Sequence, residues 1–543
     1  MQTVSESWKN EHTKSILNES FVEISLDIAD PIAIADARAT SADNDDMDNG
    51  AIYISDSKSV TEGGEKSTVP YCTLEQNIWC LDGSRAVIPE SNIKKNSFIS
   101  DVLSDDSCVF SGKIPTITID FNEIHSIPIP GITVTWSSAY DEFAESFDVI
   151  AYNGDTVVAS KAVTGNKAVK SLIFVDIVNY NRVVILIRKW CLPHHRARVE
   201  DVLVGINKVY GKGELFNYSH KQSVDPVSTA LPKFEINFSI DNIDGEYNPY
   251  NPYGLAKYLM ERQEVKTRYG LKLDDGTIEW IPGGTFYLSE WYAKQNGITA
   301  DFTARDVLEF MSEVYTENHD ISKYRSLYEL ATMLLEKANL PKTSDGNNRW
   351  VLKWDTWAEI HTNAPLPEDT LANNLQLVAN MGECVLYQDR DGILHIEPLK
   401  DIDSDYEINS FNSYSKSEIT LSKPIKQVKV KVYTYTSATE STTTEVSYPQ
   451  TVSEDVKGET IIIDNPLVIN TPRAWSIGKW IYDYLGHRMT LDSSWRPDVS
   501  LDALDVVKNK NSYSTNQVRM TDVEFTYNGA FRGTGKGKVI GNG

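Results

Sequence analysis

The stretch TIEWIPGGTFYLSEWY, residues 277–292, decides the fold class of this chain. It lies in a run of four strand-like segments with the turn signals DDG (274–276) and NG (296–297): FEINFSIDN (234–242), VKTRYGLKL (265–273), TIEWIPGGTFYLSEWY itself and ITADFTARD (298–306). Aromatic and β-branched residues between Asn, Asp and Gly turns predict successive β-strands. We interpret this run as a small β-barrel.

The first strand of that barrel lies far upstream. FVEISLDIAD (21–30) alternates apolar and polar residues, which is the period-two pattern of a strand. Between it and the barrel, strand-like segments follow one another with short turns such as NGD (153–155) and without helical periodicity, which predicts a β-sandwich or a jelly roll. We therefore assign residues 1–44 to an arm and the first strand, 45–205 to an inserted sandwich, and 206–312 to the rest of barrel 1.

The pattern becomes helical further along the chain. SLYELATMLLEKANLP (326–341) and EDTLANNLQLVANMG (368–382) carry leucines at helical spacing, and Asp391-Gly392 predicts a hairpin turn after them. Residues 313–410 are thus a small α/β domain. Residues 411–543 return to strands around an amphipathic helix at 471–488, which predicts barrel 2. The fold class is mainly β with minor α+β: two small β-barrels flank an α/β unit, and a sandwich is inserted.

Charge and composition exclude several classes of function. The chain has 52 Lys and Arg against 77 Asp and Glu, a formal net charge of −25 in 543 residues. Binding to phosphates requires clustered basic residues, so we expect no specific nucleic-acid binding. No stretch approaches the roughly 20 apolar residues of a membrane span, so we expect no membrane insertion. Five cysteines without paired spacing, and no signal peptide at the start, predict a protein made in the cytoplasm.

Three places in the sequence are candidate metal sites. Cys191, His194 and His195 lack a fourth ligand nearby, so an ordinary loop is favoured over zinc. DRDG (389–392) followed by Glu397 starts like a calcium loop, but Leu394 and His395 stand where oxygen ligands are needed, which favours a hairpin turn. The acidic run DNDDMD (43–48) is typical of a solvated loop. We predict no metal and no cofactor.

No catalytic motif is present. The sequence contains no HExxH, GxSxG, P-loop or GxGxxG pattern, and with so many carboxylates any catalytic pair would be arbitrary. We therefore predict no catalytic residues and no enzymatic activity.

Several segments together resemble tail proteins of phages and prophages of Gram-positive bacteria. The segments, in chain order, are YCTLEQNIWCLDGSRAVIP (71–89), SIDNIDGEYNPYNPYGL (239–255), GGTFYLSEWY (283–292), TADFTARDVLEFM (299–311) and AWSIGKWIYDYL (474–485). Such proteins are similar to the central hub of phage baseplates, contractile bacteriocins and type VI secretion spikes. The resemblance implies a homotrimer in which each chain gives two β-barrels to a ring with a channel.

The resemblance also implies a location and partners. The location is the virion tail, at the baseplate or tail tip, after assembly in the cytoplasm of the bacterial host. The partners are the tail tube protein, the tape-measure protein, the tip or spike protein, and baseplate wedge or sheath-initiator proteins. A ring of this kind joins a sixfold tail tube to a threefold tip.

One loop is a candidate for subunit contacts. IDGEYNPYNPYG (243–254) is stiffened by Pro249 and Pro252 and carries Tyr247, Tyr250 and Tyr253. Tyrosine gives a large contact area at low entropic cost, so these five residues are candidate interface residues. A well-packed surface loop is the equal alternative.

The inserted sandwich leaves two other functions open. WSSAYDEFAESFDVIAYN (136–153) and RARVEDVLVG (196–205) resemble discoidin-like, galactose-binding modules. The resemblance implies either a carbohydrate-binding receptor protein of the tail tip or a structural bracket. An exposed Trp or Tyr cluster beside Arg at one end of the sandwich would favour the receptor. A tail-tip peptidoglycan hydrolase is a further alternative, and it would need a catalytic domain.

Overall fold

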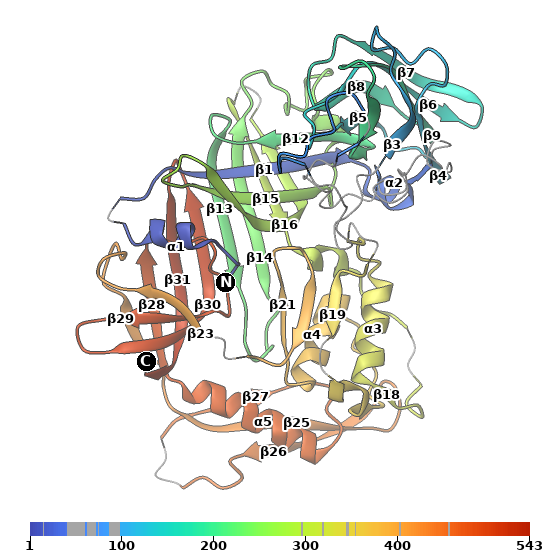
Figure 1. The fold of residues 1–543 in the computed structure, drawn as a ribbon. Coiled ribbons are helices and arrows are strands. Elements are labelled where there is room, and N and C mark those ends of the chain that lie inside the picture. Colours follow the sequence, from blue (N-terminus) through green and yellow to red (C-terminus); the bar gives the residue numbers. More distant parts are fainter. Residues whose placement is uncertain are drawn as a thin grey trace.

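The protein is described from a computed structural model, and its mainly β fold class is confirmed (Figure 1). The structure describes residues 1–542 except 15, 41–59, 62–71, 74, 86–97, 295–296, 318–319, 344–346, 353–354, 401–402 and 454–456. The helix α1 (Glu6–His12) precedes the first strand. None of the described helices has the length and apolar character that a membrane span needs.

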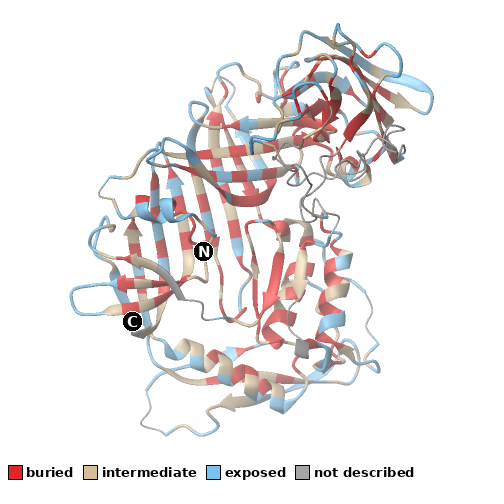
Figure 2. Cartoon of the chain, in the orientation of Figure 1, coloured by how far each residue is buried: buried red, intermediate tan, exposed pale blue. Residues whose placement is uncertain are grey.

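A first group of six strands, called unit 1, includes the segments that predicted barrel 1. Its strands are β1 (Ser20–Ala29), β13 (Leu215–Ser223), β14 (Lys233–Asp241), β15 (Glu264–Lys272), β16 (Ile278–Ala293) and β17 (Thr299–Arg305). A further strand, β12 (Gly205–Tyr210), pairs with β1, and the 3-10 turns η4 (Ala256–Tyr258) and η5 (Val307–Met311) flank the unit. Along β1, β14 and β17, buried residues alternate with intermediate or exposed ones, as Figure 2 shows.

A second group of six strands, called unit 2, comes from the end of the chain. Its strands are β23 (Asp403–Ile408), β24 (Glu418–Leu421), β28 (Met489–Trp495), β29 (Val506–Lys510), β30 (Thr515–Tyr527) and β31 (Phe531–Asn542).

The two units share one strand order. Unit 1 runs β1-β15-β16-β17-β14-β13 across the sheet, and unit 2 runs β23-β29-β30-β31-β28-β24. In both, the order by position in the chain is first, fourth, fifth, sixth, third, second. The pairing differs at one place, because β1 is antiparallel to β15 whereas β23 is parallel to β29. The chain therefore contains the same six-strand topology twice.

Neither unit is a closed barrel in the part of the chain that the structure describes. No ladder there joins β13 back to β1 or β12, and instead β13 pairs with β30 of unit 2. The two units, together with β12, thus form one sheet of 13 strands that curls around a common apolar core. The two predicted barrels take the form of two curled halves of one sheet, because the edge that would close unit 1 is used to join unit 2.

The sandwich lies at one end of the molecule, beyond β12 and β1 (Figure 1). Its core holds the fully buried rings of Trp136, Phe147 and Trp190. Its described residues form one helix and three sheets, whose elements are α2 (Pro31–Asp36); β2 (Arg38–Thr40), β4 (Thr116–His125), β9 (Tyr180–Trp190), β6 (Ala144–Asn153) and β7 (Thr156–Thr164); β11 (Asp201–Leu203), β5 (Ile129–Thr135) and β8 (Lys170–Ile177); and β10 (Arg196–Val199) with β3 (Phe98–Leu103). The predicted turn at Gly154 is confirmed between β6 and β7.

An α/β layer covers the other end of the molecule and has its own apolar core. It comprises α3 (Leu327–Lys337), α4 (Leu371–Met381), η6 (Asp355–Ala358), β18 (Arg325–Ser326) with β20 (His361–Thr362), β19 (Trp350–Leu352) with β22 (Leu394–Glu397) and β21 (Val385–Gln388), and β25 (Ile425–Tyr435) with β26 (Ser441–Tyr448), β27 (Glu459–Ile463) and α5 (Thr471–Gly486). The three predicted helices are confirmed. Residues 425–486, expected within barrel 2, form a separate sheet and helix instead, since Val428, Val430 and Ile477 pack into this layer.

The sandwich enters and leaves unit 1 at one point. Ala29 at the end of β1 pairs with Gly205 at the start of β12, and all residues between them belong to the insertion. Ala33, Ala37 and Ala39 are buried in the sandwich core, so the segment before residue 41 already packs there. The predicted boundary at residue 45 lies outside the described residues.

We predict that replacing Asp30–Val204 by an Asn-Gly turn leaves the remainder folded. Ala29 and Gly205 are already antiparallel partners, and Asn-Gly suits a two-residue hairpin. Circular dichroism and a cooperative thermal transition measure the outcome. The control deletion, 45–205, should be less stable because it leaves Ala33, Ala37 and Ala39 without their packing partners. Loss of cooperative unfolding in the Asn-Gly variant alone would contradict the prediction.

Candidate subunit interface and the joint behind it

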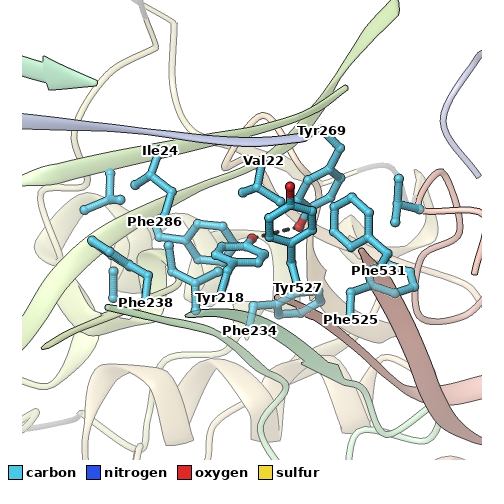
Figure 3. Packing of buried hydrophobic residues seen from close by; sticks show 14 of the residues in the cluster. Val22, Ile24, Tyr218, Phe234, Phe238, Tyr269, Phe286, Phe525, Tyr527 and Phe531 are labelled. Atoms are coloured by element: carbon cyan, nitrogen blue, oxygen red, sulfur yellow. Dashed lines mark hydrogen bonds between the residues drawn. The ribbon is translucent and has the colours of Figure 1, made fainter. Parts of the chain in front are cut away.

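The joint between the units is a ladder of six antiparallel residue pairs. It runs from Tyr218 opposite Tyr527 to Ser223 opposite Asp522. Phe525 and Tyr527 of β30 point into the same core as Tyr218 of β13 (Figure 3). The joint therefore combines backbone hydrogen bonds with a shared apolar interior, and it holds the two units as one body.

Buried polar groups cross the core at this joint. The Tyr218 hydroxyl lies 2.8 Å from the Tyr269 hydroxyl, as drawn in Figure 3, and Nδ1 of His220 lies 2.7 Å from that same hydroxyl. Tyr269 belongs to β15, so these contacts bring β13 and β15 together across the curled sheet. Buried polar groups need such partners, because an unpaired group in the core is costly.

Arg390 ties the α/β layer to both units. Its guanidinium donates to the Pro282 carbonyl of unit 1 at 2.7 Å and to the Val499 and Leu501 carbonyls near unit 2 at 2.7 and 3.0 Å. Its Nε donates to Asp502 Oδ1 at 2.7 Å. The side chain of Arg390 is 4% exposed, so this one residue satisfies three separate parts of the fold in the interior.

Charge state at the joint follows from these contacts. Burial alone would raise the pKa of Asp502, but the Arg390 guanidinium, the N-terminal ammonium group and hydrogen bonds from Gln2 and Gln222 together outweigh it, and the pKa lies below its usual value. Burial, together with Arg390, lowers the pKa of His220 to about 3, so His220 is neutral near pH 7. No sequence pattern indicated this network beyond the turn DRDG that carries Arg390.

The predicted interface loop divides into a buried and an exposed part. Tyr247 is 2% exposed; it packs edge-on against Phe302 and lies in hydrogen-bonding contact with Tyr210. Tyr247 is thus corrected to a core residue that anchors the loop. Tyr250 and Tyr253 are 80% and 95% exposed, and Pro249 and Pro252 are exposed beside them. Only these four remain candidates for subunit contact.

A free strand edge lies at the far end of unit 2. β24 pairs with β28 on one side, and no described strand pairs with its other side. Ile419 and Leu421 of β24 are 59% and 62% exposed. An edge of this kind presents unpaired backbone groups beside apolar side chains, which favours addition of another strand.

The structure separates the two histidines of the candidate zinc site. Nδ1 of His195 contacts Glu142 at 2.8 Å, whereas His194 contacts Asp106 at 2.8 Å on the surface. Cys191 Sγ accepts from the Phe143 amide. No cluster of three or more possible metal ligands occurs among the described residues.

Residues 389–392, the candidate calcium loop, form the predicted hairpin turn. Oδ1 of Asp389 accepts from the Asp391 and Ile393 amides, and Gly392 has a φ of 76°. Glu397 instead accepts from the Tyr387 hydroxyl at 2.6 Å. The acidic run 43–48 lies outside the described residues.

One end of the sandwich holds a charged and aromatic cluster. Glu142 accepts from the Trp190 indole at 2.7 Å and lies 3.5 Å from Arg198. The guanidinium groups of Arg198 and Arg85 lie 4.4 and 5.3 Å from the centroid of the Tyr140 ring. Trp79, six residues before Arg85, is 53% exposed.

Comparison with known proteins finds likeness in structure alone. No family model matches the chain, and no curated protein sequence matches it. Similar solved structures include a 43 kDa tail protein of prophage MuSo2 from Shewanella oneidensis (12% identity, 61% of this chain and 95% of that chain, TM-score 0.41). Others are the tail protein from Neisseria meningitidis MC58 (10%, 62% and 94%, TM-score 0.42) and prophage tail protein gp18 from Listeria monocytogenes EGD-e (9%, 61% and 91%, TM-score 0.37).

We predict that Arg390→Met lowers the free energy of unfolding by about 3–5 kcal/mol, since it leaves the Asp502 carboxylate in the joint without its cation. Lys479→Met is the control, because Lys479 and Asp483 form an ion pair whose side chains are 47% and 52% exposed. The control should leave the free energy of unfolding almost unchanged, because an exposed ion pair contributes little to stability. Urea unfolding measures both, and equal effects would contradict the role of Arg390.

We predict a pH dependence that comes from His220. Its folded pKa of about 3 lies below the unfolded value, so protons bind the unfolded state preferentially and stability falls as pH drops from 6.5 towards 3. Relative to His220→Gln, the wild type should lose about 1.4 kcal/mol per pH unit below pH 6. Urea unfolding of both proteins between pH 7 and pH 4 measures this, and parallel profiles would refute it.

Proposed function

We propose that this chain is the structural hub protein of a phage-type tail tip or baseplate. Three copies form a ring around a channel, and each copy contributes both six-strand units. The observation that carries this proposal is the repeat of one strand order within the chain, with the two units joined side by side in a continuous sheet. The resemblance of segments 239–255, 283–292 and 474–485 to tail proteins supports the same function.

The repeat gives a physical reason for a ring. A chain with two like units presents nearly the same shape twice, so three chains offer six similar positions to a sixfold neighbour and three identical ones to a threefold neighbour. The free edge of β24 leaves the sheet unfinished at one end, which supports association with another chain. In this proposal the chain acts as a structural part without catalysis.

The proposed location defines the proposed partners. On the sixfold side the partner is the tail tube protein, and on the threefold side it is the tip or spike protein. The tape-measure protein occupies the channel before ejection, and wedge or sheath-initiator proteins contact the outer surface. The sandwich, at one end of the molecule, is then a peripheral bracket.

We predict that the particle-bound protein is a trimer. Native mass spectrometry of tail tips, released under mild conditions, should give three chains in the ring. A single chain per particle, or a ring of six whole chains, would overturn the proposal. The Tyr250→Ala/Tyr253→Ala variant tests whether the loop lies in the subunit interface. If the two tyrosines lie there, the variant trimer dissociates at a higher protein concentration than the wild-type trimer does.

A second candidate function is carbohydrate binding by the sandwich. The observation that favours it is the half-exposed ring of Trp79 in the segment that brings Arg85 to Tyr140. An exposed indole offers an apolar face and an N–H donor to a sugar ring. Binding of the isolated protein to host cell-wall polysaccharide, lost in Trp79→Ala and retained in Tyr513→Ala, would support this function. No binding by the wild type would exclude it.

A further inference from the structure

The joint within the chain follows a simple geometric rule. The long strand β30 pairs with β31 along one edge, while the short strand β29 covers only Thr515–Arg519 on the other edge. The uncovered remainder of that other edge, residues 522–527, is where β13 of unit 1 adds. Thus β13, which lies at the end of unit 1 in the sheet, pairs with the part of the β30 edge that β29 leaves uncovered.

Unit 1 has an equivalent strand edge that is paired over only part of its length. By strand order, β16 corresponds to β30, β15 to β29, and β17 to β31. β15 covers one edge of β16 up to Tyr287, and the backbone of Gln263 and Arg262 extends this to Leu288. From residue 289 to 293 that edge has no partner strand among the described residues, whereas β17 covers the opposite edge.

Burial along β16 agrees with an unfilled position. In unit 2, where β13 is in place, Val523, Phe525 and Tyr527 are buried. In unit 1, Trp291 and Ala293 pack against the core but are only partly buried. The same structural position is therefore closed in unit 2 and open in unit 1.

The strand of unit 2 that is equivalent to β13 is β24, and one of its edges has no partner strand among the described residues. Both are the second strand of their unit, and both lie at its end in the sheet. Each also lies near the fourth strand of its unit across the curled sheet. Tyr218 and His220 of β13 reach Tyr269 of β15. Asn509 of β29 donates to Ser417, just before β24. All four residues of β24 are exposed, whereas Tyr218, His220 and Gln222 of β13 are buried.

We propose that β24 of one copy adds antiparallel to residues 289–293 of β16 in a second copy of this chain. The contact repeats between chains the joint that β13 and β30 make within a chain, and it rests on the ring proposed above. It buries Ile419 and Leu421 of one copy near Trp291 and Ala293 of the other. Because the two surfaces differ, each copy uses one of each, and such a head-to-tail contact closes into a three-membered ring when it relates neighbouring copies by a third of a turn.

Charged substitutions in β24 test the contact. Ile419→Glu/Leu421→Glu replaces two exposed side chains, so the fold should be kept, as circular dichroism can verify. Sedimentation at concentrations from about 1 to 100 µM should show a trimer for the wild type and a monomer for the variant. The two added carboxylates on β24 resist the addition of another strand to this edge. Tyr513→Glu is the matched control; Tyr513 is 99% exposed on unit 2 outside β24, and its variant should remain trimeric.

A photo-crosslinker locates the partner surface. Benzoylphenylalanine in place of Ile419 should form a covalent bond to residues 288–293 of another chain, identified by mass spectrometry of a mixture of isotope-labelled and unlabelled protein. A trimer whose crosslinks lie elsewhere would overturn this pairing and leave the ring intact. Crosslinks between two β24 strands would indicate a twofold dimer and overturn both. A wild type that is monomeric at every concentration, alone and in the particle, would also overturn both.

Discussion

The antiparallel ladder between β13 and β30 is the interaction on which the rest of the structure depends. It turns two six-strand units into one sheet and merges their interiors into a single apolar core. A strand that closed unit 1 on itself would occupy the edge of β13 and leave the two units joined only by loops. The open form therefore has a structural purpose, because the same edge that a barrel would hide becomes the bond between halves.

Large segments are inserted without disturbing this sheet. The sandwich leaves unit 1 between its first and second strands, at two residues that already face each other across a ladder. The layer formed by α3, α4 and α5 is built from two separate segments, one between the units and one inside unit 2. Arg390 then fixes that layer to both units through backbone carbonyls and Asp502. Rigid units with attached modules suit a protein that must hold a fixed position in a large assembly.

The sequence predicted local elements well and long-range arrangement only in part. Alternation along FVEISLDIAD and the leucine spacing in 326–341 locate β1 and α3, because both depend on neighbours in the chain. The pairing of β13 with β30 depends on residues about 300 positions apart, so no local pattern could indicate it. For the same reason 425–486 was assigned to the wrong layer. Tyr247 was expected on the surface with Tyr250 and Tyr253, but spacing alone cannot tell which ring of a Pro- and Tyr-rich loop turns inward.

The central claim is that the repeated strand order within the chain serves a ring of like units. Electron microscopy of assembled tail tips, reconstructed without imposed symmetry, tests it most directly. The account predicts three chains around a channel, with six similar β units in which contacts within a chain and contacts between chains look alike. A ring whose wall is built from unit 1 or unit 2 alone, or a particle that contains a single copy of the chain, would contradict it.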